Sequence, residues 1–122
     1  LIEVYENTNS FENIIDIKLL ETGFYINDSL VKADQITNSV KSLISQNLDY
    51  IVRLFVDDGI VFSDYFIVLT GIFESISDLR NEYSIKNFSK EYDLLDFEEQ
   101  DLVKQEIPFR LFELSPEMEF EK

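Results

Sequence analysis

Residues 13–26 read NIIDIKLLETGFYI, and this stretch decides the fold class. Alternate residues of a β-strand point to the same face, so one face of this segment carries the apolar residues Ile15, Ile17 and Leu19. Residues 21–23, Glu-Thr-Gly, follow as a three-residue connection that ends in glycine, which is typical of a β-hairpin. We therefore expect an antiparallel pair of strands at this point of the chain.

A helix is the alternative for residues 10–22. Asn9 would cap this helix, Glu12 would complete the capping box, and Gly23 would end it. The hairpin is favoured, because the apolar residues would be spread around the whole circumference of a helix instead of forming one face.

The clearest helix in the sequence follows the hairpin. After a turn at residues 27–28 and a short third strand expected at residues 30–32, Asp34 is a candidate N-cap. The helix is expected to run to about Leu48. Apolar side chains recur along it at the spacing of one helix face: Ile36, Val40, Leu43, Ile44 and Leu48.

Residues 50–69 have the pattern of a second hairpin. Residues 50–56 and 60–69 are rich in β-branched and aromatic residues, and Asp-Asp-Gly lies between them. Asp-Gly between two such runs is a strong hairpin signal. Because both faces of these strands are partly apolar, they would lie at the centre of a sheet covered by helices. The alternative continues the preceding helix as far as Val56.

Two helices are expected in the C-terminal half, over residues 74–83 and about residues 89–105. Each contains the spacing of a capping box: Ser75 with Asp78, and Asp96 with Glu99. The apolar residues of the second helix are Leu94, Leu95, Leu102 and Val103.

A final edge strand is expected at residues 109–114, ended by Ser115-Pro116. Together these patterns predict an α+β fold: a single small domain whose antiparallel sheet of four to six strands packs with two or three helices. The globular domain is expected to span residues 1–114, and residues 115–122 to form an acidic C-terminal tail.

The composition of the 122-residue chain excludes several kinds of chemistry. It has no cysteine and no histidine, which excludes disulfides, zinc–thiolate sites, cysteine nucleophiles and histidine acid–base catalysis. Three glycines are too few for a glycine-rich phosphate loop. Twenty-five acidic and ten basic residues give a net charge of −15, which opposes binding to nucleic-acid phosphates. We expect no enzymatic activity, no cofactor and no metal; a hydrolase that uses acidic residues is the least favoured class.

The acidic residues are concentrated toward the C-terminus. Residues 91–122 hold 11 acidic and three basic residues (net −8), whereas residues 1–90 hold 14 and seven (net −7). Such density destabilises a folded chain by self-repulsion, so we expect it to serve a partner of opposite charge. The alternative is that it only keeps the protein soluble. The candidate partner-binding residues are Glu91, Asp93, Asp96, Glu98, Glu99, Asp101, Glu117, Glu119 and Glu121.

Two smaller features carry further expectations. Asp57, Asp58 and Asp64 offer oxygen ligands to a divalent cation, but aspartates at a tight turn more often bond their own backbone. Arg53 lies within an apolar run, and we expect its head group to reach solvent rather than to be buried beside a carboxylate.

Charge and size together indicate a small protein that binds and neutralises a basic protein partner, such as a nuclease or a nucleic-acid-binding protein. Inhibitors, immunity proteins and phage anti-defence proteins that imitate nucleic-acid charge are of this kind. The alternative is an acidic chaperone or assembly-type module that holds a partner segment through apolar surface.

The expected location is the cytoplasm of a bacterial or phage-infected cell. One alanine against 14 isoleucines suggests an AT-rich genome, and the absence of cysteine suits a reducing compartment. The first residues lack the pattern of a signal peptide. The longest apolar run, residues 60–73, is too short to span a membrane.

Overall fold

Residues 8–114 are described by the computed structural model, and they contain five strands and three α-helices. The strands are β1 (Asn13–Leu20), β2 (Gly23–Ile26), β3 (Ser29–Val31), β4 (Tyr50–Val56) and β5 (Leu111–Leu114). The helices are α2 (Ile36–Gln46), α3 (Phe62–Phe88) and α4 (Phe97–Glu106), and the short 3-10 helices are η1 (Thr8–Ser10), η2 (Ala33–Gln35) and η3 (Tyr92–Leu94).

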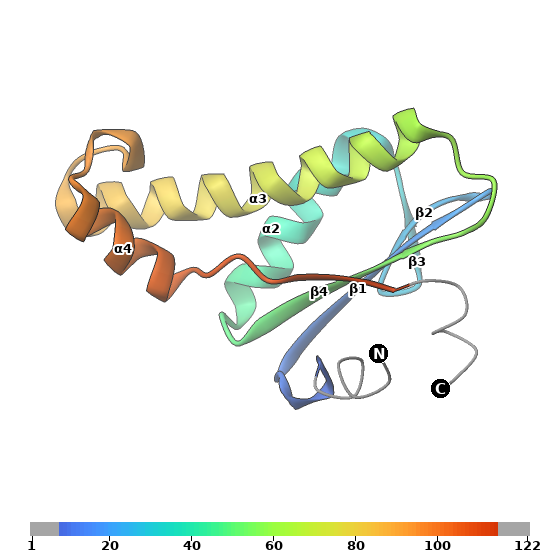
Figure 1. Ribbon diagram of the computed structural model, residues 1–122, viewed down its shortest axis with the longest axis horizontal. Helices are drawn as coiled ribbons and strands as arrows, with labels where there is room; N and C mark the ends of the chain where they lie inside the picture. The colour runs from blue at the N-terminus through green and yellow to red at the C-terminus, as the bar shows by residue number, and fades with distance from the viewer. Residues whose placement is uncertain (1–7, 115–122) are drawn as a thin grey trace.

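The strands form one sheet in the order β3-β2-β1-β4-β5 (Figure 1). The predicted hairpin of β1 and β2 is confirmed, and β3 adds a third antiparallel strand. Asn27 and Asp28 both have positive φ angles, 48° and 68°, as the tight turn between β2 and β3 requires. The α+β prediction is confirmed, but only in part as an antiparallel sheet, because β4 pairs in parallel with both β1 and β5.

Strand β4 lies between two parallel neighbours, and its residues 50–55 are all buried. Parallel strands cannot be joined by a tight turn and need a long crossover, usually through a helix. Helix α2 belongs to the crossover from the β1–β3 strands to β4, and α3 belongs to the crossover from β4 to β5. The apolar pattern of residues 50–56 therefore indicated a central strand correctly.

The second half of the predicted hairpin over residues 50–69 is wrong. Residues 60–61 connect to α3, and residues 62–69 form the first turns of this helix instead of a strand. The alternative, in which the preceding helix continued to Val56, is wrong as well, since α2 ends at Gln46. Intrinsic propensity is a weak guide here: the β-branched and aromatic residues of this run are held in a helix because the parallel pairing of β4 and β5 needs a crossover.

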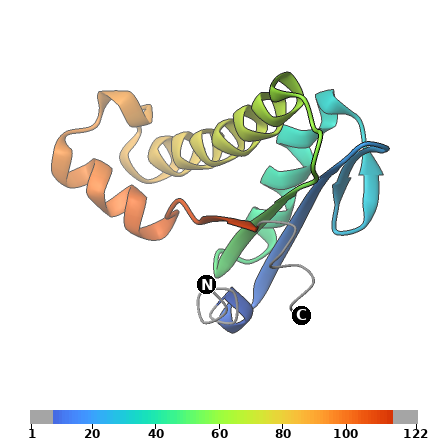
Figure 2. The same ribbon diagram turned by 45° about the vertical axis from the view of Figure 1, so that its right-hand side comes forward.

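The main core lies between the sheet and the two helices α2 and α3, which cover the same face (Figures 1 and 2). Alternate residues of the central strands supply its lower layer: Ile15, Ile17, Leu19, Tyr50, Val52 and Leu54. The helices supply the upper layer: Ile36, Val40, Ile44, Val68, Ile72, Ile76 and Leu79.

Helices α2 and α3 pack closely against each other at Gly71. A methyl group added there would lie 2.7 Å from Ile36 Cγ2, so only glycine fits the crossing. One turn further on, the Ser75 hydroxyl donates to the carbonyls of Thr37 and Gly71, each at 2.7 Å. Ser75 is therefore a buried residue of a helix interior and not the predicted cap.

Helix boundaries differ from the sequence prediction at two further places. Asp34 lies inside η2, and α2 begins after Gln35 without a side-chain cap. The helix expected over residues 89–105 is divided into η3 and α4, and the capping box of Asp96 and Glu99 that begins α4 is confirmed.

Arg53 is buried on the sheet face opposite the helices, so the expectation that its head group reaches solvent is wrong. Its guanidinium donates to both carboxylate oxygens of Asp16, at 2.6 and 2.8 Å, and to Thr8 and Asn9. Asp16 and Arg53 are direct neighbours in the parallel pairing of β1 and β4, which explains the two-point contact. In residues 8–114 no helix combines the length and the apolarity that crossing a membrane requires.

Replacing Gly71 with alanine is expected to destabilise the domain by about 1–2 kcal/mol, because the steric overlap with Ile36 outweighs the roughly 1 kcal/mol that alanine gains as a helix former. Urea unfolding followed by circular dichroism measures the change. Ser77→Ala, on the exposed side of the same helix, is the matched control and should change the free energy of unfolding by less than about 0.5 kcal/mol. An unchanged stability of Gly71→Ala would contradict the close crossing.

Replacing Asp16 with alanine is expected to cost about 1–3 kcal/mol of stability, because it leaves the buried Arg53 guanidinium without its carboxylate. Glu82→Ala is the control, since it breaks the more exposed Lys41–Glu82 pair and should cost no more than about 1 kcal/mol. Chemical denaturation of both variants tests this difference. Equal losses of stability in the two variants would show that burial does not increase the contribution of the Arg53–Asp16 pair to the stability of the fold.

Candidate functional site

The predicted acidic residues between positions 91 and 101 lie at the far end of α3, away from β2 and β3 (Figures 1 and 2). We call residues 90–106, which include η3 and α4, the distal lobe. At 1.5 Å per residue, the 27-residue α3 is about 40 Å long, whereas the seven-residue β4 spans about 23 Å. The C-terminal part of α3 therefore extends past the sheet and carries the distal lobe.

Hydrogen bonds hold the distal lobe against α3. Helix α3 ends at Ser89, whose φ of 59° is left-handed and reverses the chain. On α3, the Asn81 side chain accepts a bond of 2.9 Å from the backbone nitrogen of Tyr92, and the Arg80 Nε donates to the Ile107 carbonyl at 2.9 Å. Leu95 and Val103 are buried, so the lobe also has an apolar contact of its own.

Two of the predicted binding residues have a structural role. The Asp96 carboxylate accepts a 2.8 Å bond from the backbone nitrogen of Glu99, and the Glu99 carboxylate accepts a 3.2 Å bond from the backbone nitrogen of Asp96. Both carboxylates also lie at the N-terminal end of α4, where the helix dipole favours negative charge. Part of the acidity of the lobe is thus explained by the start of α4.

The other five carboxylates of the distal lobe are all exposed: Glu91, Asp93, Glu98, Asp101 and Glu106. The structure has three ion pairs between residues of the 8–114 segment: Lys18–Asp28, Lys41–Glu82 and Arg53–Asp16. None of them includes a residue of the distal lobe. The lobe has seven acidic residues and two basic ones, Lys90 and Lys104, so its charge is not neutralised internally.

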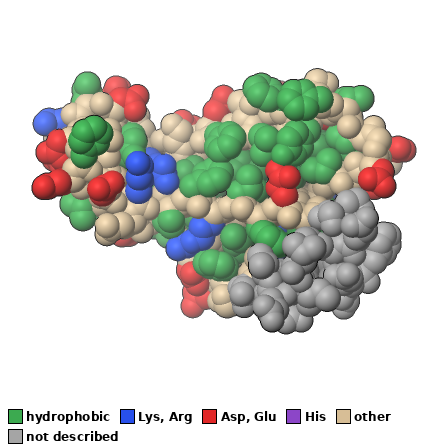
Figure 3. Space-filling model, in the orientation of Figure 1, with side chains coloured by type: hydrophobic (Ala, Val, Ile, Leu, Met, Phe, Trp, Pro, Cys, Tyr) green, Lys and Arg blue, Asp and Glu red, His purple; other side chains and the backbone are tan. Residues whose placement is uncertain are grey.

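Apolar side chains are exposed between these carboxylates, which the sequence analysis did not identify. Phe97 is 86% exposed, Leu94 68% and Leu102 53%, so two of the four apolar residues named for the expected helix lie largely at the surface. In Figure 3 the left-hand end of the molecule has hydrophobic side chains interspersed with acidic ones. The apolar pattern of the sequence could not show this, because α4 contributes only one buried residue of its own, Val103, to the lobe.

Three of the predicted binding residues, Glu117, Glu119 and Glu121, lie outside the described residues. The structure therefore brings six of the nine together in one lobe: Glu91, Asp93, Asp96, Glu98, Glu99 and Asp101.

Other parts of the described chain show fewer features of a binding or catalytic site. In residues 8–114 no three acidic side chains are grouped so as to hold a metal ion. The Asp57 carboxylate accepts a 3.0 Å bond from the backbone nitrogen of Asp58, which is the expected turn chemistry. An open hollow of about 690 Å³ between the β2–β3 hairpin and α2 has Asp34 as its one charged lining residue.

Two tyrosines have raised pKa values for different reasons. Burial raises the pKa of Tyr50, whose hydroxyl donates to the Pro108 carbonyl at the start of the β5 segment. A hydrogen bond to the Glu113 carboxylate raises the pKa of Tyr65. The Tyr50 hydroxyl joins β4 to Pro108, just before β5, and the Tyr65 hydroxyl joins α3 to Glu113 in β5. Neither tyrosine is in the distal lobe.

Comparisons with protein-family models, curated proteins and solved structures found no match to this chain.

Replacing Asp96 with alanine is expected to destabilise the start of α4 by about 1 kcal/mol, because one backbone donor loses its cap. Amide hydrogen exchange of residues 97–100 should become several-fold faster, while exchange in β1 and β4 stays unchanged. Asp93→Ala removes an equally exposed carboxylate of the lobe that has no capping bond and is the control. Equal effects of both variants would contradict the capping role.

Proposed function

We propose that the protein is a non-enzymatic binding protein that recognises a basic protein partner through the distal lobe. The observation that carries this proposal is the combination of exposed, internally uncompensated carboxylates with the exposed Phe97, Leu94 and Leu102.

Each part of this surface has a distinct physical role in binding. Complementary charge speeds the encounter of two proteins and fixes their orientation, but contributes less to affinity. Affinity comes mainly from a few anchor side chains that become fully desolvated, and aromatic residues are prominent among them. The carboxylates of Glu91, Glu98 and Asp101 would speed and orient the encounter with the partner. Phe97 would supply the affinity.

A purely solubilising surface accounts less well for the distal lobe. Solubility requires charge without contiguous apolar residues. A phenylalanine exposed to 86% on the first turn of α4 opposes that requirement, since it presents a large apolar surface to water.

Binding through the distal lobe would neutralise the partner. A basic protein that binds nucleic acid does so with a cationic surface that contacts phosphates. Carboxylates that occupy this surface would compete with phosphates directly, as in inhibitors and immunity proteins. A cytoplasmic location is part of the proposal, supported by the chain's lack of cysteine.

Reversing three lobe charges, Glu91→Lys, Glu98→Lys and Asp101→Lys, is expected to weaken partner binding at least about tenfold, a loss of about 1.4 kcal/mol. The immobilised full chain first retains basic proteins from an extract of the source cells at low salt. The dissociation constant of the purified partner is then measured at low and high salt. Affinity should fall steeply as salt screens the carboxylates.

The matched control reverses three exposed carboxylates outside the lobe, Glu21→Lys, Asp34→Lys and Asp58→Lys, and changes the net charge by the same amount. This control should retain most of the affinity. Phe97→Ser should lose affinity without altering the salt dependence. An equal loss of affinity in both triple variants would show that only the net charge of the chain matters and would contradict a specific role of the lobe. Unchanged partner binding by the lobe variant would overturn the proposal.

A further inference from the structure

The second surface of interest is the free edge of β5, at the opposite side of α3 from α2. In the order β3-β2-β1-β4-β5, β5 has β4 on one side and no described strand on the other. The backbone nitrogen of Val52 donates to the Arg110 carbonyl at 3.1 Å, so residues 110, 112 and 114 direct their backbone groups toward β4. The backbone groups of Leu111 and Glu113 therefore point away from the sheet.

Helix α3 carries a row of exposed aromatic side chains, and one of them, Phe73, contacts the segment that leads to β5. Phe62, Phe66 and Phe73 lie on one side of the helix and are 74%, 59% and 52% exposed. Phe73 stacks on Phe109, in the segment leading to β5, with ring centres 5.1 Å apart. Figure 3 shows hydrophobic side chains gathered over α3 and toward the strands on this face.

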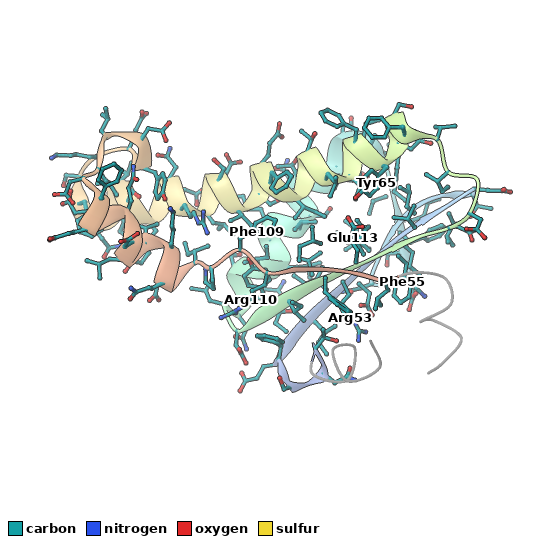
Figure 4. All side chains as sticks on the ribbon, viewed as in Figure 1. Arg53, Phe55, Tyr65, Phe109, Arg110 and Glu113 are labelled. Carbon is teal, nitrogen blue, oxygen red and sulfur yellow. The ribbon has the colours of Figure 1, made fainter. Side chains whose placement is uncertain are left out.

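Tyr65 and Glu113 mark the other end of the same surface. The Tyr65 hydroxyl on α3 donates to the Glu113 carboxylate on β5, and Figure 4 shows the two side chains directed toward each other across the space between the elements. Glu113 pairs with Leu54, a core residue, so its side chain lies on the helix-covered side of the sheet. It is nevertheless exposed, because no further strand lies beside it in the described chain.

The free backbone groups of β5 and the exposed aromatic side chains beside it both lack a covering strand in the described part of the chain. A sixth strand beside β5 would satisfy the outward backbone groups of Leu111 and Glu113. Its helix-side residues would also cover the stacked rings of Phe73 and Phe109. Strand addition of this kind takes its affinity from main-chain hydrogen bonds and its specificity from alternate side chains.

We propose that an extended segment of a partner protein adds to β5 as a sixth strand, with an apolar residue beside Leu111 and a lysine or arginine beside Glu113. The two residues are separated by one residue, because alternate side chains share a face. A second copy of the chain fits less well, since each copy carries a net charge of −15 and the two would repel each other. The proposal is independent of the distal lobe.

The experiment selects peptides from a random eight-residue phage-displayed library on the full-length chain. Enriched peptides are expected to contain an apolar residue and, two positions away, lysine or arginine. A synthetic peptide of this type should perturb the NMR amide signals of Leu111 and Glu113. Glu113→Lys should weaken its binding about tenfold, and replacing the peptide's cation with glutamate should restore binding to that variant.

Matched variants separate this surface from the distal lobe. Phe73→Ser and Phe109→Ser should each weaken peptide binding about tenfold, as expected for aromatic anchors. Phe97→Ser and the triple lobe variant Glu91→Lys, Glu98→Lys and Asp101→Lys should leave it unchanged. Circular dichroism confirms that each variant is folded.

The proposal is overturned if no peptide enriches, if enriched peptides bind wild type and Glu113→Lys equally, or if amide changes are confined to elements other than β5. A concentration-dependent dimer that disappears in Phe73→Ser would show that a second copy occupies the surface and would also overturn the proposal. Loss of peptide binding in the lobe variant alone would assign the peptides to the distal lobe.

Discussion

The parallel pairing of β4 with both β1 and β5 is the constraint on which the rest of the structure depends. A central strand with two parallel neighbours is reached and left through crossovers, and it must be covered by apolar side chains. Helices α2 and α3 provide both the crossovers and the apolar cover. Their close crossing at Gly71 lets them cover the same face of the sheet together. The crossover to β5 is much longer than the sheet requires. Its surplus forms the distal lobe (Figure 1).

Much of the fold follows from local sequence patterns. The alternation of Ile15, Ile17 and Leu19 identified β1, and the paired spacing of Asp96 and Glu99 identified the start of α4. Residues 60–69 were misassigned because their β-branched and aromatic side chains suit a buried strand as well as a buried helix. Only the partner of β4 decides between them, and that partner, β5, is some 55 residues further along the chain.

The candidate site was predictable in its charge and not in its apolar component. Clustering of acidic residues is visible in the composition of residues 91–122. Exposure of Phe97 and Leu102 depends on how α4 rests on α3, with Val103 inward. The burial of Arg53 was missed for a similar reason, since Asp16 becomes its neighbour only through the pairing of β1 with β4. Long-range pairing, which a single sequence does not reveal, decided each of these points.

The two proposed surfaces use different physical chemistry and lie on different elements. The distal lobe combines long-range charge with one aromatic anchor, so salt weakens its interactions. The β5 edge offers backbone hydrogen bonds, the stacked pair Phe73 and Phe109 and a single carboxylate, so its interactions depend little on salt. One partner could engage both surfaces only by spanning the length of α3, about 40 Å.

Hydrogen–deuterium exchange of the full chain, alone and with its retained basic partner, tests the central claim most directly. The account predicts that bound partner slows exchange in residues 91–106, where the uncompensated carboxylates surround Phe97, and leaves β1–β3 unaffected. Slower exchange confined to β1–β3 and α2, with the lobe unchanged, would contradict it.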